Sequence, residues 1–99
     1  AGHVLDVCFT DLVASENGLY ETVLENHHDG SSLTVWQERG HMHVFTGDTL
    51  ARDRRQSIAL EPVETPTNAF NHQELADAMT LQPGETRSFR FGVRFVAAR

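Results

Sequence analysis

The sequence contains no lysine and no long apolar run, and each absence narrows the range of functions. All eight basic residues are arginines, against 14 aspartates and glutamates, which gives a formal net charge of −6. A surface of this sign repels phosphate backbones and anionic lipid headgroups, so we expect neither nucleic acid nor a membrane as a partner. No apolar stretch approaches the roughly 20 residues that a membrane-spanning helix needs.

There is a single cysteine, Cys8, which excludes a disulfide within the chain. A lone cysteine favours a reducing compartment, so we expect a cytoplasmic location. Its apolar neighbours favour a small buried hydrophobe over a nucleophile. The stretch from Ala1 to Asp6 has neither the basic start nor the long apolar segment of a signal peptide, and it resembles a chain entered in mid-strand.

Short apolar segments separated by turn residues make up most of the sequence, and this pattern is typical of an all-β protein. The expected strands are Val4–Phe9, Leu19–Leu24, Leu33–Gln37, His41–Thr46, Ser57–Leu60 and Phe89–Phe95. Asp29-Gly30 predicts a hairpin between the second and the third. In the last strand, large apolar residues alternate with Arg90, Gly92 and Arg94, which predicts one apolar face. We therefore expect an antiparallel β-sandwich.

Between the strands, residues 48–56 are expected to form a polar loop, residues 62–72 an ordered loop, and residues 73–81 a single helical turn. The sandwich prediction leaves the apolar face of the last strand without enough partners in 99 residues. An open sheet face or edge favours association. This shortage of packing partners indicates that the protein contains further residues beyond these 99.

Three features are candidates for chemistry. Glu61 ends an apolar strand and is followed by Pro62, which would hold the carboxylate at a sheet rim. A carboxylate there could act as a general base or accept hydrogen bonds from sugar hydroxyls. The alternative is that Glu61 is simply exposed to solvent. Asp6 lies in an apolar stretch, where a carboxylate needs a hydrogen bond, either from a neighbouring loop or from a ligand hydroxyl. His41 and His43 share one face of a strand and could form half of a metal site, but no further ligands follow at familiar spacing, so we expect no metal.

Four segments, in this order, resemble motifs of the aldose 1-epimerases of the galactose-mutarotase-like group. Leu5–Leu12 resembles the family's LD-x-x-FT-x-L segment, and Val44–Leu50 the strand and loop that follow it. Ala59–Asn71 resembles the block that runs from EP to P-x-(N/D)-A-F, and Leu81–Glu85 the turn before the final strand. Each motif alone is loose, but four in register are specific.

The resemblance implies a large antiparallel sandwich that binds a monosaccharide such as glucose or galactose and interconverts its α and β anomers without a cofactor. It assigns the catalytic base to Glu61 and the binding of sugar hydroxyls to Asp6. The family's histidine acid has no counterpart here, and neither His41 nor His43 falls on its motif. The resemblance therefore implies that residues 1–99 are the C-terminal part of one sandwich domain, that its remainder precedes Ala1, and that this part alone is inactive.

Two other functions fit the same residues. The first is a carbohydrate-binding module on the same fold without turnover. The second is an epimerase of an anionic sugar, in which Arg52, Arg54 and Arg55 bind a phosphate or sulfate, because the arginine fork suits such groups. For these arginines, a solvated loop is the simpler interpretation.

Overall fold

The computed structural model describes residues 3–98, and it confirms the all-β class. All paired strands run antiparallel, in two three-stranded sheets. The elements are β1 (Asp6–Phe9), β2 (Tyr20–Glu25), β3 (Ser32–Gln37), β4 (His41–Phe45), β5 (Ala59–Val63), the 3₁₀ turns η1 (Ala69–Asn71), η2 (Gln73–Leu75) and η3 (Asp77–Met79), and β6 (Phe91–Val96). No helix among them is long and apolar enough to cross a membrane.

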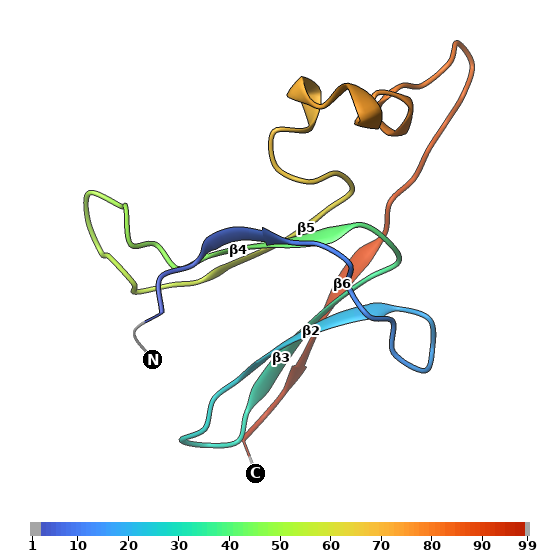
Figure 1. The fold of residues 1–99 in the computed structure, drawn as a ribbon. Coiled ribbons are helices and arrows are strands. Elements are labelled where there is room, and N and C mark those ends of the chain that lie inside the picture. The colour runs from blue at the N-terminus through green and yellow to red at the C-terminus, as the bar shows by residue number, and fades with distance from the viewer. Residues whose placement is uncertain (1–2, 99) are drawn as a thin grey trace. The chain divides into compact units, whose positions relative to one another are not determined.

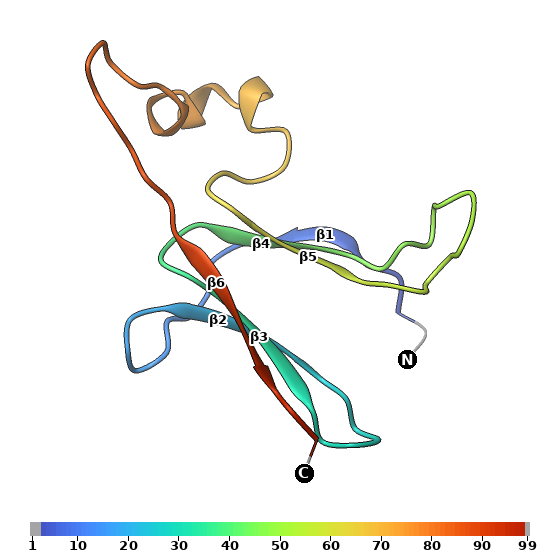
Figure 2. The ribbon, with the colours of Figure 1, turned by 180° about the vertical axis from the view of Figure 1, so that it is seen from behind.

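The chain divides into two compact units, which are described separately. The first comprises the described residues up to Leu12 together with Gly40–Arg87, and it contains the sheet β1-β4-β5. The second comprises Val13–Arg39 and the described residues from Ser88 onward, and it contains the sheet β2-β3-β6. Figures 1 and 2 show the strands of each sheet side by side.

In the first unit, the pleat of β4 separates apolar from polar side chains. Met42 and Val44 point to one face and are buried, with exposed fractions of 2% and 6%. Their burial stabilises the unit by about 1.5–3 kcal/mol each. Because side chains alternate along a strand, His41 and His43 point to the other face, as the sequence predicts.

The strand that carries Glu61 differs from the expectation. It was expected to run from Ser57 to Leu60 and to end at Glu61-Pro62, whereas β5 spans Ala59–Val63. Pro62 is tolerated because β5 is an edge strand of its sheet, where a residue without an N–H group costs no ladder hydrogen bond. The predicted rim position is therefore wrong: Glu61 is the central residue of the strand and lies on the face of the sheet.

The polar loop between β4 and β5 is tied back to the residues that precede β1. The Thr46 N–H donates to the Leu5 carbonyl at 2.8 Å, and the Leu5 N–H donates to Thr46 Oγ1 at 3.0 Å. The Thr46 hydroxyl also hydrogen-bonds to Asp48. Arg55 Nη1 donates to Asp48 Oδ1 at 2.7 Å. These bonds hold the end of β4 beside β1.

Asp48 should make the stability of the protein depend on pH. Hydrogen bonds from the Thr46 hydroxyl and then from the Arg55 guanidinium lower the pKa of this carboxyl below its usual value. The folded-state pKa lies below the unfolded value of about 3.9, so the contribution is present above that pH and is lost as the pH falls through the folded-state pKa. Asp48→Asn should therefore reduce the free energy of unfolding at neutral pH and leave it nearly unchanged at low pH.

Denaturant unfolding of both proteins at about pH 7 and at about pH 2, which lies below the reference pKa of aspartate, checks this dependence. The matched control is Asp11→Asn, at an exposed aspartate with a positive φ of 57° that asparagine also tolerates. The expectation for Asp48 is wrong if its substitution has the same effect at both pH values.

The second unit contains the expected hairpin. β2 pairs with β3 in register from Tyr20 opposite Gln37 to Glu25 opposite Ser32. Gly30 has a φ of 78° in the turn, which is the left-handed conformation that the Asp-Gly dipeptide predicts.

β6 pairs with the other side of β3 and keeps the predicted alternation. Phe91, Val93 and Phe95 point to one face and are 54%, 60% and 66% exposed. On the opposite face, the Trp36 indole occupies the space above Gly92, where a Cβ atom would meet its ring at 2.4 Å. A glycine at this position therefore lets the indole lie against the strand.

The segment after β5 is more regular than expected. Residues 62–72 were expected to be a loop, but they include η1, which begins after Asn68 in the left-handed conformation with a φ of 63°. The single helical turn expected within residues 73–81 is instead the two 3₁₀ turns η2 and η3. Asparagine adopts the left-handed conformation of Asn68 at little cost because its side chain is short and polar. The turn η1 can therefore begin there, although the sequence shows no steady period.

Candidate functional site

One row of side chains crosses all three strands of the first sheet. His43 on β4 is the register partner of Cys8 on β1 and of Glu61 on β5. Register partners in antiparallel strands point to the same face, so these three side chains share it. Asp6 joins them because it lies two residues before Cys8 on β1. We call this the site face.

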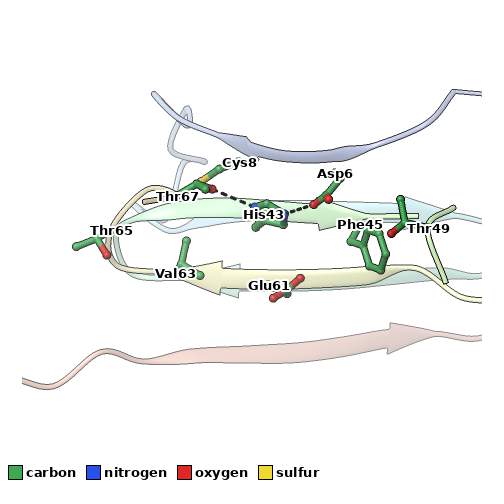
Figure 3. Close-up of a pocket in the computed structure, with 9 residues that line it drawn as sticks. All are labelled: Asp6, Cys8, His43, Phe45, Thr49, Glu61, Val63, Thr65 and Thr67. Atoms are coloured by element: carbon green, nitrogen blue, oxygen red, sulfur yellow. Dashed lines mark hydrogen bonds and ion pairs between the residues drawn. The ribbon is translucent and has the colours of Figure 1, made fainter. Parts of the chain in front are cut away.

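The site face carries an open hollow of about 350 Å³. This volume lies within the range of small-molecule sites in proteins. The lining side chains come from the three strands and from the loops after β4 and β5 (Figure 3): Asp6, Cys8, His43, Phe45, Thr49, Glu61, Val63, Thr65 and Thr67.

His43 is held at both ring nitrogens, as the dashed lines in Figure 3 show. Nε2 lies 2.8 Å from Asp6 Oδ1, and Nδ1 lies 3.4 Å from Thr67 Oγ1. A neutral ring satisfies both contacts when Nε2–H donates to the carboxylate and Nδ1 accepts from the threonine hydroxyl; this tautomer is assigned from the partners. The His43 side chain is 21% exposed, whereas that of Asp6 is 59% exposed.

The two carboxylates that the sequence singles out line the same hollow. The apolar stretch does not bury Asp6, because its side chain is 59% exposed, so solvent could satisfy the carboxylate. Its one hydrogen bond comes from a histidine on the neighbouring strand rather than from a loop group. Glu61 is exposed and lies across from His43. Their proximity is what the sequence hypothesis requires, while their roles in binding and catalysis stay predictions.

His43 and Cys8 belong to the site, although sequence reasoning assigned neither to it. The alternation in β4 predicted the face to which His43 points, but the neighbours on that face depend on strand order. Cys8 was expected to be buried among apolar side chains, but it is only partly buried and lines the hollow. The two-residue spacing of Cys8 from Asp6, and the alternation of histidines with apolar residues in β4, are the signals that could have indicated these two residues.

Two of the three arginines in the loop between β4 and β5 hydrogen-bond to the loop or to residues beside it. Arg54 Nε donates to the Leu50 carbonyl at 2.9 Å, and Arg55 bonds to Asp48 and to the His3 carbonyl. No arginine is among the side chains that line the hollow in the described part of the chain. Residues 3–98 also contain no group of three or more His, Cys, Asp or Glu side chains that could hold a metal ion.

Comparisons of the chain with protein-family models, with curated proteins and with solved structures found no match. A functional assignment therefore depends on the geometry of the hollow and on the four motifs.

Proposed function

We propose that the hollow binds a monosaccharide and that the chain is the C-terminal part of an aldose 1-epimerase, with Glu61 as general base and Asp6 as acceptor of sugar hydroxyl groups. The observation that carries the proposal is the position of these two carboxylates along one open hollow on one sheet face. Glu61 and Asp6 lie far apart in the sequence. At the level of the sequence, only the resemblance assigned both of them to the same ligand.

The reaction needs one base and one acid. The base removes the proton from the anomeric hydroxyl while the acid protonates the ring oxygen, and the C1–O5 bond breaks to give the open-chain aldehyde. Rotation about C1–C2 and the reverse transfers give the other anomer. Glu61 suits the first role because its carboxylate is exposed on a strand that is paired with β4. The proposal assigns the acid to a histidine in a part of the protein outside residues 1–99, and the reaction needs no cofactor.

The same part of the protein would cover the apolar surfaces of the described residues. Phe91, Val93 and Phe95 form an exposed apolar face, and Phe70 is 92% exposed. Large apolar surfaces of this kind mark contacts with other protein segments. We propose that further strands of the sandwich pack on them and that the protein is cytoplasmic, where Cys8 would stay reduced.

One observation favours a binding module without turnover as the second candidate. The only histidine that lines the hollow, within residues 3–98, uses both ring nitrogens in contacts with Asp6 and Thr67. It is therefore not free to protonate a ring oxygen. The anionic-sugar alternative has less support, because Arg54 and Arg55 bond elsewhere and Arg52 is not among the residues that line the hollow.

Replacement of Asp6 tests the sugar site. Asp6→Ala should weaken the binding of galactose or glucose by roughly tenfold to a hundredfold, because a hydrogen bond to a charged group contributes about 1.5–3 kcal/mol. Calorimetric titration of the full-length protein measures this, and polarimetry with fresh α-anomer measures turnover. Asp77→Ala is the control, at an exposed aspartate that does not line the hollow and has no positive φ. Equal affinity of the Asp6 variant and the wild type would exclude this carboxylate from the sugar site.

A further inference from the structure

The Asp6 carboxylate is fixed through only one of its two oxygens. Oδ1 accepts the hydrogen bond from His43 Nε2 at 2.8 Å. Among residues 3–98, no group hydrogen-bonds to Oδ2, and the side chain is more than half exposed. A flexible aspartate is thereby held in one rotamer with an acceptor oxygen left over at the hollow.

The His43 ring is itself fixed from two sides. It belongs to the central strand of its sheet, so its backbone is paired with both β1 and β5. The Thr67 hydroxyl lies 3.4 Å from Nδ1 and suits the tautomer that places the proton on Nε2, facing Asp6. Supporting contacts of this kind orient a functional group with precision.

The ionisable groups that face His43 are mostly acidic. Asp6 and Cys8 face it from β1, and Glu61 faces it from β5. On its own strand, the nearest ionisable side chain on the same face is His41. A positive charge on His43 would therefore lie between two carboxylates.

We infer that His43 is a positioning residue of the sugar site: it holds Oδ1 of Asp6 and so presents Oδ2 to a sugar hydroxyl. The inference rests on the proposed function. The neutral ring does this without neutralising the acceptor.

The test compares His43→Gln with His43→Ala in the full-length protein. A glutamine amide can still donate to Asp6, whereas alanine removes the donor. His43→Ala should weaken galactose binding roughly tenfold and raise KM by a similar factor, with kcat within about twofold. His43→Gln should bind within about threefold of the wild type, because the bond to Asp6 is kept.

The outcomes separate the inference from the proposed function. If the wild type binds no sugar, the proposed function fails and the inference fails with it. If the wild type binds sugar and His43→Ala binds equally well, or loses kcat with KM unchanged, only the inference is overturned. If His43→Ala does not fold, the comparison of His43→Gln with His43→Leu decides, because leucine fills the space without donating a hydrogen bond to Asp6. Equal affinity of these two variants overturns the inference.

Discussion

Glu61→Gln is expected to lower the kcat of mutarotation by roughly 10²- to 10⁴-fold, which is the usual contribution of a positioned general base. The substitution keeps the size of the side chain and its place at the centre of β5. It removes the carboxylate that, in the proposed mechanism, takes the proton from the anomeric hydroxyl. Sugar affinity should therefore change by less than about threefold, since a hydroxyl can hydrogen-bond to an amide as well as to a carboxylate.

Polarimetry of fresh α-galactose with the full-length variant measures kcat, and calorimetry measures the dissociation constant. Glu16→Gln is the matched control, because Glu16 is exposed, belongs to the second unit and is not among the residues that line the hollow. If Glu61→Gln retains turnover while the control behaves as the wild type, Glu61 is not the base. If binding is lost together with turnover, its role is in binding instead.

Gly40→Ala should lower the free energy of unfolding by roughly 2–4 kcal/mol, the sum of a left-handed backbone and a steric clash. Gly40 has a φ of 93°, and a Cβ atom at this position would lie 2.2 Å from the Val63 carbonyl oxygen. The Val63 oxygen belongs to the backbone, so it cannot rotate out of the way as a side chain could. It lies beside the first pair of the β4–β5 ladder, His41 opposite Val63, so its displacement disturbs the register that places His43 opposite Glu61.

Gly84→Ala separates the two causes. Gly84 has a similar φ of 82°, but nothing lies within 4 Å of the added Cβ atom. This substitution should cost only about 1–2 kcal/mol, the price of the left-handed conformation for a non-glycine residue. Urea unfolding of both variants gives the comparison. Equal destabilisation would show that the contact with Val63 adds nothing.

The local elements could be predicted because their causes are local. Three predicted features are present: the Asp29-Gly30 turn, and the alternation of side chains in β4 and in β6. Each depends on only a few consecutive residues. The end of β5 was mispredicted because proline usually ends a strand. Whether it does so here depends on whether the strand lies at an edge, and strand order is not a local property.

For the site, the sequence by itself determined which side chains share a strand face: Asp6 with Cys8, and His41 with His43, because alternation follows from strand geometry. It also supplied the motifs that single out Glu61. Only the tertiary structure decided that β4 lies between β1 and β5, in a register that brings Cys8, His43 and Glu61 into one row. The physical reason is that pairing between distant strands depends on the packing of whole faces, so the hydrogen bond between His43 and Asp6 exists only once the sheet has formed.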